Sequence, residues 1–411
     1  MTGRGRFTAP ALLAAAALLA YGGPRIASLG FYHDDWWFLN VMRFAPAGFA
    51  PRLAALLQDT PILHFRPLDA PLAAALYGAF GLEPLGWQAA SLAANLACAL
   101  AAWRILGSFG AGPRTAVLGA LLALVYPNKD AAAFWPTTVI IPASYALFLA
   151  GYLAHLDWVT SGRRASLAAA SLCLLCSLGV YEQSLLQVAA WAITPEPPGA
   201  RRGRLAAGLA AAAATAVLFL AYKFLIVPRL WGVSFNKPVI LSLSNFLVVS
   251  LRALESSFGW RLASSVGAAV AAAFREQPVT AVMAAALPWV VWTLCPEGEP
   301  AAAGRAGRLA LLGGALFVLG YLPFTVSDYR PTPLTHMNRI NMVPAGGLAL
   351  AAAAAALGGR RRLWQAVGAG AGSLFLAAHV GFAGYWAESW RLQSRARDIV
   401  VHRLAQWPAD P

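Results

Sequence analysis

The chain has 411 residues, of which 59% are hydrophobic and only 12% are charged, and its mean hydropathy is +0.60. This composition excludes an ordinary water-soluble globular domain, in which roughly 25% of the residues are charged. The net charge of +14 does not indicate a nucleic-acid-binding protein, because the arginines occur in small clusters between apolar runs and form no continuous basic face.

Apolar runs long enough to cross a lipid bilayer as helices recur along the chain. We expect an all-α polytopic membrane protein, a single membrane domain over residues 1–411, with about eleven membrane-crossing helices. The first run is predicted to be a retained helix and not a cleavable signal peptide, because Pro24 and Arg25 follow it where a cleavage site would be needed. The expected crossings are Thr8–Gly22, Leu85–Leu106, Thr115–Tyr126, Thr138–Asp157, Ala165–Val180, Ser184–Ile193, Leu205–Val227, Val279–Leu294, Leu309–Val326, Met342–Leu357 and Leu363–Tyr385.

Short basic loops predict the orientation of these helices. The loops that carry Arg4, Arg104, Arg163, Arg201, Arg305 and Arg360 all fall on one side, which is the cytoplasm by the positive-inside rule. We therefore expect a multi-pass protein of the bacterial inner membrane with its polar chemistry on the periplasmic side. Residues 228–277 are predicted to form amphipathic helices on the outer interface, and residues 386–411 a short basic tail.

The first outer segment, residues 31–84, is the longest polar stretch and is predicted to hold the active site. It begins with Tyr32-His33-Asp34-Asp35-Trp36-Trp37, directly after the first apolar run. Two adjacent carboxylates repel each other, so one can accept a proton while the other stays ionised. An acidic and aromatic anchor at the membrane interface, with no catalytic role, explains the same residues.

A second motif, His64-Phe65-Arg66-Pro67-Leu68-Asp69, opens the amphipathic stretch Leu68–Phe80, which is predicted to lie along the outer surface as a juxtamembrane helix. Arg66 is a candidate for binding a phosphate group, of a substrate or simply of a lipid. Ionisable groups at helix ends of a membrane protein are further candidates, although the two cations among them also suit snorkelling to the interface. They are Lys129, Glu182, His336 and Arg339.

These motifs together resemble the GT-C superfamily of membrane glycosyltransferases, closest to the branch of protein O-mannosyltransferases and lipid A aminoarabinose transferases. The resemblance covers the order of elements from Thr8 to about Ile193 and, more weakly, the Asn338-Arg339 loop. The acidic pair is Asp-Asp here, where some members have Asp-Glu. The other matching features are Arg66-Pro67 before a surface helix, Trp87-Gln88 leading to Asn95, and the motifs Phe65-Arg66-Pro67-Leu68 and Tyr181-Glu182-Gln183-Ser184.

The resemblance implies a GT-C-like fold and the transfer of a sugar, with inversion, from a polyprenyl-phosphate-linked donor to an acceptor hydroxyl outside the cytoplasm. Asp34 would be the general base, and Asp35 would orient it or help to hold a divalent metal ion. Arg66, Lys129 and Arg339 would bind the donor phosphate. The sugar or acceptor pocket would contain His33, His64, Tyr145, Glu182 and His336, and an optional metal ion would be held by Asp35, His64 and Glu182.

The expected partners are the polyprenyl-phosphate sugar donor, membrane lipids and an acceptor that is a glycan, a lipid or a protein, with no nucleic acid. No cofactor is expected beyond the optional divalent ion. Two other function classes stay open. A transporter or lipid flippase would carry paired, interrupted helices with ionisable groups near the middle of the bilayer, whereas a non-catalytic scaffold would use the acidic pair only as an anchor.

Overall fold

The computed structural model describes residues 3–196, 201–234, 239–299, 301–302, 304–358 and 360–405, and the side chains of residues 8–402 within these ranges. In this part of the chain there are seventeen α-helices joined by short 3₁₀ and π segments, without a β-strand. The predicted all-α class is therefore confirmed. The side chain of Arg4 and residues 406–411 of the expected tail lie outside the described residues.

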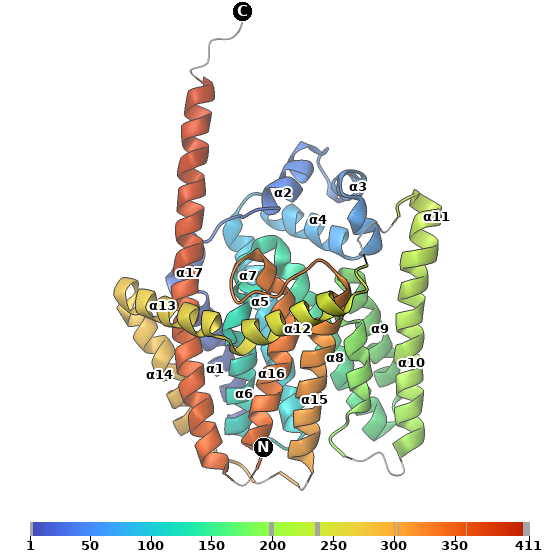
Figure 1. Cartoon of the computed structure of the whole chain (residues 1–411), viewed down its shortest axis with the longest axis vertical. Helices are drawn as coiled ribbons and strands as arrows, with labels where there is room; N and C mark the ends of the chain where they lie inside the picture. Colours follow the sequence, from blue (N-terminus) through green and yellow to red (C-terminus); the bar gives the residue numbers. More distant parts are fainter. Residues whose placement is uncertain are drawn as a thin grey trace, which may run out of the picture.

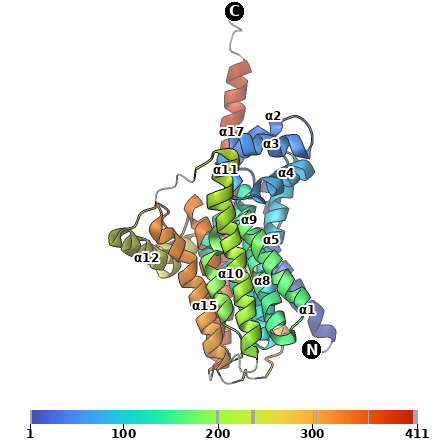
Figure 2. The same ribbon diagram turned by 90° about the vertical axis from the view of Figure 1, so that its right-hand side faces the viewer.

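The long helices stand side by side in one bundle and alternate in direction (Figures 1 and 2). We call the end where α5 and α8 begin the cavity end, and the end where they finish the arginine end. One set runs from the cavity end, and consists of α5 (Pro84–Ser108), α8 (Ile140–Ser161), α14 (Pro278–Leu294) and α16 (Met342–Ala355). The other set runs toward the cavity end, and consists of α1 (Gly3–Ala20), α6 (Pro113–Val125), α9 (Arg164–Val180), α10 (Arg202–Ala221), α15 (Arg305–Tyr321) and α17 (Arg361–Ala405).

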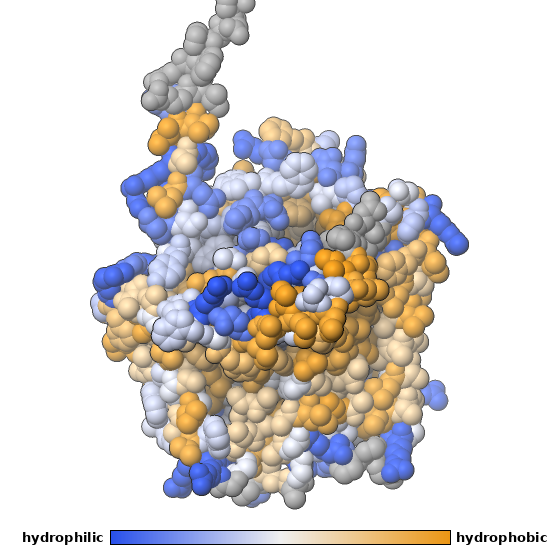
Figure 3. Space-filling view, in the orientation of Figure 1, coloured by the Kyte–Doolittle hydropathy of each residue, from blue (hydrophilic) through white to orange (hydrophobic). Residues whose placement is uncertain are grey.

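Five helical stretches are long and apolar enough to cross a membrane. They are Pro84–Ser108, Pro136–Ser161, Arg202–Trp231, Arg305–Val326 and Arg361–His402. Shorter apolar helices of 10–17 residues cover Thr8–Ala20, Pro113–Val125, Arg164–Val180 and Pro278–Leu294. A broad apolar band covers the visible side of the bundle, with polar side chains gathered above it and at its lower rim (Figure 3). This arrangement fits a multi-pass membrane protein.

Residues 31–84 fold into a cap over the cavity end (Figure 1). The cap contains α2 (Asp35–Phe44), α3 (Phe49–Asp59), the 3₁₀-helix η2 (Pro61–Phe65) and α4 (Asp69–Phe80). A small apolar core of its own, which includes Leu39, Met42, Leu56 and Leu63, holds these helices together. The predicted surface helix over Leu68–Phe80 thus matches α4 closely. A further short 3₁₀-helix, η1 (Gly23–Ser28), joins α1 to the cap.

Between α6 and α8 the chain makes three short elements at the cavity end, and a further loop faces them. The three elements are η3 (Pro127–Lys129), α7 (Asp130–Phe134) and η4 (Pro136–Val139). The facing loop runs from η9 (Leu322–Val326) to η10 (His336–Asn341). Each of these elements has a proline or a polar residue in its first two positions, where a membrane helix has to end and reverse.

The expected helical crossing over Ser184–Ile193 has a different local structure. It consists of the 3₁₀-helices η5 (Glu182–Ser184) and η6 (Leu186–Ala192) and continues as irregular chain to Glu196. Glu182 pairs with Arg66 at the cavity end, and Glu196 pairs with Arg305 at the arginine end. Since a 3₁₀-helix rises about 2.0 Å per residue and an α-helix about 1.5 Å, this short run covers more of the bundle than an α-helix of equal length.

Two amphipathic helices, α12 (Leu243–Phe258) and α13 (Trp260–Glu276), run across the upright helices, as expected for residues 228–277 (Figure 1). One face of α12 is buried against η9 and α15, through Val249 and Ala253. Its other face exposes large apolar side chains, including Leu247 and Leu251. These exposed apolar side chains suit a helix packed on protein on one side and on lipid on the other.

The prediction of a separate tail from residue 386 is wrong. The last helix, α17, continues without a break from Arg361 to Ala405, a length of 45 residues. At about 1.5 Å per residue it is about 68 Å long, roughly twice the thickness of a hydrocarbon core. Its upper part projects beyond the cap (Figure 1).

Candidate functional site

A cavity of about 310 Å³ lies beneath the cap, between η2, α4, η4 and the start of α8. Most of its wall is apolar or aromatic, and Trp87, Trp135 and Ile141 contribute to it. Four charged side chains line it from three separate parts of the sequence: Asp34, Arg66 with Asp69, and Arg339. The structure therefore brings together one of the two predicted catalytic carboxylates and two of the three predicted phosphate-binding cations.

The two neighbouring aspartates have opposite environments. Asp34 precedes α2, is exposed and lines the cavity. Asp35 is fully buried, and its carboxylate accepts hydrogen bonds from Tyr32 N (2.7 Å), Trp135 Nε1 (2.9 Å) and Thr137 N (3.0 Å). Burial raises the pKa of Asp35 to about 7, although these donors oppose the shift. Asp35 therefore fastens the cap to η4, while Asp34 is the carboxylate that a bound molecule meets.

Arg66 lies at the base of the cavity in a network of charges. Its Nε donates to Glu182 Oε2 at 2.8 Å, and its guanidinium lies 4.3 Å from the centre of the Tyr181 ring. Lys223 Nζ donates to the other carboxylate oxygen of Glu182 at 2.9 Å. The positive charges of Arg66 and Lys223 favour the ionised form of Glu182. Glu182 is thus an ionised anchor for two cations.

A second cavity of about 210 Å³ lies on the other side of Arg66. It shares Arg66, Tyr181 and Tyr329 with the first cavity and adds Glu182 and Lys223. The rest of its wall, formed by η9 and Val239, is largely apolar. The two cavities therefore have a common wall, and a cation of that wall is accessible from both.

Lys223 was not identified from the sequence as a site residue. It lies in a π-helical turn, η8 (Tyr222–Ile226), between α10 and α11 (Val227–Trp231). Its side chain is buried, whereas the next three residues, Phe224 to Ile226, are exposed. A π-turn inserts one extra residue into the helical repeat and re-aims the side chains around it, and such turns are frequent at functional sites. The sequence does not indicate this π-turn, because Lys223 appears there only as a single lysine in an apolar run.

His33 and His336 lie beside each other, with ring centroids 5.5 Å apart, although neither lines the cavity. The His33 ring also lies 5.3 Å from that of Trp135, over which the guanidinium of Arg339 packs at 4.9 Å. His33 has a φ of 44° and Thr335, just before His336, a φ of 84°. Non-glycine residues with positive φ have a strained backbone and gather at functional sites. The backbone at His33, and just before His336, is therefore held in a conformation that it does not favour.

The loop that carries Arg339 is held by two buried asparagines. Asn338 accepts a hydrogen bond from Ala131 N at 3.0 Å and donates to Asp130 Oδ1. Asn341 donates to Asn128 O at 2.7 Å and to Ser256 Oγ at 2.9 Å. These bonds join η10 to α7, η3 and α12. The position of Arg339 is therefore fixed by its neighbours in sequence.

Besides Asp35, His33 and His336, three more predicted site residues line neither cavity. Lys129 is buried and contacts Met342 Sδ at 3.5 Å, outside the lining of either cavity, because its short 3₁₀-helix turns it into the bundle. Tyr145 is buried in α8 beside Gly346 and stacks on Phe148. His64 stacks on Trp231 of α11, with ring centroids 4.8 Å apart. The third cation of the two cavities, besides Arg66 and Arg339, is therefore Lys223 and not the predicted Lys129.

The predicted metal ligands Asp35, His64 and Glu182 do not form one cluster. Asp35 is enclosed by its three donors, Glu182 is paired with two cations, and His64 lies against an aromatic ring. Among the described residues there is no group of three His, Cys, Asp or Glu side chains arranged to hold a metal ion. The structure therefore gives no geometry to the optional divalent ion.

Comparisons with protein-family models, with curated proteins and with solved structures found no match to this chain. The function of the chain therefore has to be inferred from the two cavities and their charged residues.

Proposed function

We propose that the chain is a membrane glycosyltransferase, which takes a sugar from a polyprenyl-phosphate-linked donor and passes it to an acceptor hydroxyl at the cavity end of the bundle. The observation that carries this proposal is that the exposed carboxylate of Asp34 lines the same apolar-walled cavity as Arg66 and Arg339. Sugar transfer from a phosphate needs a base for the acceptor and fixed cations for the leaving group. The GT-C-like motifs of the sequence support the same reaction.

Asp34 accepts the proton of the acceptor hydroxyl as its oxygen attacks the anomeric carbon from the face opposite the phosphate. The bond between that carbon and the phosphate oxygen breaks, and the phosphate leaves with the electron pair, so the configuration inverts. Arg66 and Arg339 stabilise the negative charge that develops on the phosphate. The aromatic wall, which includes Trp135, excludes water that would otherwise compete as acceptor.

The second cavity suits the carrier end of the donor. Lys223 and Arg66 supply two cations at its polar wall, and Phe324 and Val326 supply apolar surface beside them. Glu182 pairs with both cations. A phosphate at the common wall is then within reach of Arg66 while its sugar lies in the first cavity with Asp34.

The proposed topology has about eleven crossings of the bacterial inner membrane. It counts each of the ten helices of the two bundle sets, together with the run from Glu182 to Glu196, as one pass. The arginine end then faces the cytoplasm, in accordance with the positive-inside rule. The cavity end and its cap face the periplasm, where a glycan, lipid or protein hydroxyl is the acceptor.

The test is to replace Asp34 by Asn in cells that depend on this chain for an envelope glycan. Asp34→Asn should lower the transfer at least about 100-fold, the contribution of a general base, as measured by mass spectrometry of envelope glycans at equal protein level. Asp59→Asn is the matched control, because Asp59 is an exposed carboxylate of the same cap that does not line the cavity. Normal glycans with Asp34→Asn would rule the proposal out.

A further inference from the structure

At the arginine end of the bundle, opposite the site described above, there is another cavity, of about 370 Å³. It lies where α5 and α8 finish, beside the last residues of the 3₁₀ run and the start of α10. One part of its wall is apolar and comes from Leu153, Leu156 and Val159 of α8. The other part is polar and contains Asp157, Glu196 and Arg201.

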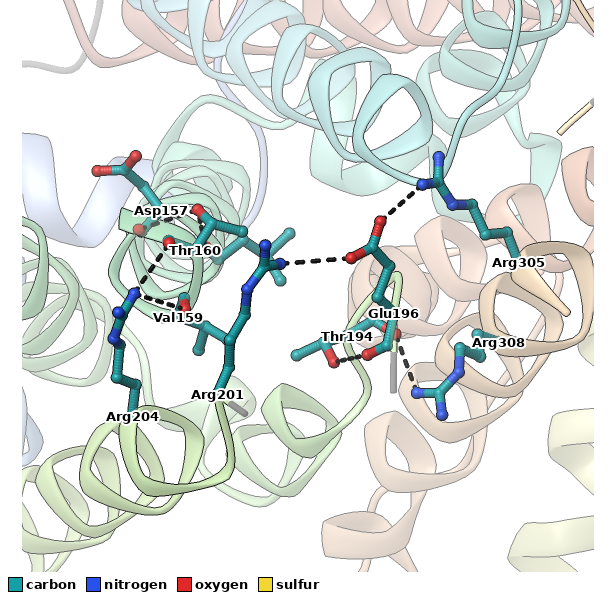
Figure 4. A network of polar contacts seen from close by, with 10 residues as sticks. Asp157, Val159, Thr160, Thr194, Glu196, Arg201, Arg204, Arg305 and Arg308 are labelled. Carbon is teal, nitrogen blue, oxygen red and sulfur yellow. Dashed lines mark hydrogen bonds and ion pairs between the residues drawn. The ribbon is translucent and has the colours of Figure 1, made fainter. Parts of the chain in front are cut away.

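Arginines from two distant parts of the chain converge on this polar wall (Figure 4). Arg201 and Arg305 both bind the carboxylate of Glu196, at 3.3 Å and 2.8 Å. Arg308 donates to Thr194 O at 3.2 Å, from the same helix as Arg305. Arg204 donates to Thr160 O at 2.9 Å, at the carboxyl end of α8.

The charges drawn in Figure 4 do not balance, because four arginines surround the two carboxylates of Glu196 and Asp157. Asp157 has a partner of its own outside this group, Arg163, at 3.6 Å. Glu196 is therefore the main counter-charge for the arginines of this wall. An excess of guanidinium groups beside a hollow favours an anion that can accept several hydrogen bonds at once, and a phosphate group does so.

The position of the cavity decides what kind of phosphate fits. It lies at the lower end of the bundle, where the apolar band of the surface gives way to polar residues (Figures 1 and 3). This is the level of lipid headgroups for a helix bundle that crosses a bilayer. The leucines of α8 offer an apolar surface directly beside the arginines, which suits a molecule with a charged head and an acyl chain.

We propose that this cavity binds the phosphate of an anionic membrane phospholipid, with Arg201 and Arg305 as its main ligands and with an acyl chain along Leu153 and Leu156. The phosphate shares or takes over the arginines that Glu196 holds. This site is separate from the sugar-transfer site and does not depend on the proposed function. It ties α10 to α15 through a lipid at the end where loops connect the helices.

The test uses the full chain in nanodiscs of phosphatidylcholine, titrated with phosphatidylglycerol, and measures bound lipid by native mass spectrometry. Arg201→Gln combined with Arg305→Gln should weaken phosphatidylglycerol binding about tenfold or more, since two charged contacts are lost. The matched control is Arg164→Gln combined with Arg202→Gln, which removes the same charge from exposed positions of the same end, outside the residues labelled in Figure 4. It should change the affinity less than about twofold.

A second variant keeps the test decisive if the first does not fold. Glu196→Gln removes the competing carboxylate and should strengthen phosphatidylglycerol binding. Equal affinity of wild type, both arginine pairs and Glu196→Gln would overturn the proposal. Inorganic phosphate and glycerol phosphate form the third arm: full competition by these soluble ions at millimolar concentration would assign the site to a free phosphate and reject the lipid.

Discussion

Asp34 and Asp35 illustrate how far single residues can be interpreted from a sequence. The pair was recognisable as a candidate site because two carboxylates follow an apolar run, but nothing in the sequence separates their roles. The separation comes from Trp135 and Thr137, whose N–H groups enclose Asp35 from a segment about 100 residues away. Arg66 and Arg339 line the cavity with Asp34, whereas Lys129 does not, because its direction depends on a 3₁₀ turn that periodicity does not reveal.

The buried aspartate predicts a pH dependence of stability. The pKa of Asp35 in the folded protein, about 7, is above its unfolded value of 3.8, so the folded protein binds more protons between these values. Its contribution to stability is complete at low pH and is lost as the pH rises toward about 7. We expect the unfolding temperature in detergent to fall between about pH 5 and about pH 8, and Asp35→Asn to reduce this fall by about half.

Burial also raises the pKa of Asp69 to about 7 and that of Asp130 to about 6. These two groups account for the fall in unfolding temperature that remains in Asp35→Asn. Thermal unfolding followed by tryptophan fluorescence at both pH values is the measurement. If Asp35→Asn shows the same fall as the wild type, Asp35 keeps its charge throughout this range and the account of its burial is wrong.

At the scale of elements, α15 and α16 pack at the closest distance that glycine permits. A Cβ at Gly313 would lie 2.5 Å from the backbone of α16, at Gly347 O and Ala351 N, whereas a Cβ at Gly314 would meet nothing within 4 Å. Gly313→Ala should therefore force the helices apart and lower the free energy of unfolding by about 2 kcal/mol. Gly314→Ala, the neighbouring control, should raise it by about 0.5 kcal/mol, because alanine is the better helix former.

Unfolding in detergent, followed by circular dichroism, compares the two glycine variants. A loss of stability with Gly314→Ala as large as with Gly313→Ala would show that helix propensity, and not the contact with α16, decides the result.

The sequence predicted most elements well where an apolar run is long, as in α5, α8 and α10. It missed the geometry of the run from Glu182 to Glu196, because a largely apolar run has the same hydropathy in a 3₁₀-helix and in an α-helix. It also ended the last helix near Tyr385, where hydropathy falls, although α17 continues as an amphipathic and charged helix to Ala405. Hydropathy marks where a helix leaves the apolar layer, and not where the helix ends.

For the whole molecule, the orientation is the prediction with the widest consequences. With the native cysteines replaced, we expect Ala47→Cys in the cap to react with a membrane-impermeant maleimide in intact spheroplasts. Ala165→Cys, at the start of α9 and thus at the arginine end, should react only after permeabilisation, since the positive-inside rule places that end in the cytoplasm. Both positions are exposed, so accessibility within the protein is matched. If Ala165→Cys reacts in intact spheroplasts and Ala47→Cys reacts only after permeabilisation, the topology is the reverse of the proposed one and the site does not face the periplasm.

The direction of the helices could be expected from the arginine loops, whereas the two cavities with a common wall could not. Their walls combine the cap, η4, η8 and η9, and a single sequence contains no record of which distant segments meet. Each charged residue could thus be identified from the sequence as a separate candidate. Their grouping around Arg66 required coordinates.

Tyr32 donates its hydroxyl hydrogen to the carbonyl of Trp386, and Trp390 stacks on Trp36. The cap therefore packs against a helix that is synthesised about 350 residues later. During synthesis the ribosome has therefore delivered Asp34 and Arg66 long before Arg339 and the supporting tryptophans leave its exit tunnel. Contacts of such high sequence separation form late. A prematurely terminated chain that stops before α17 is complete would insert most of its helices and still hold an unfinished cavity.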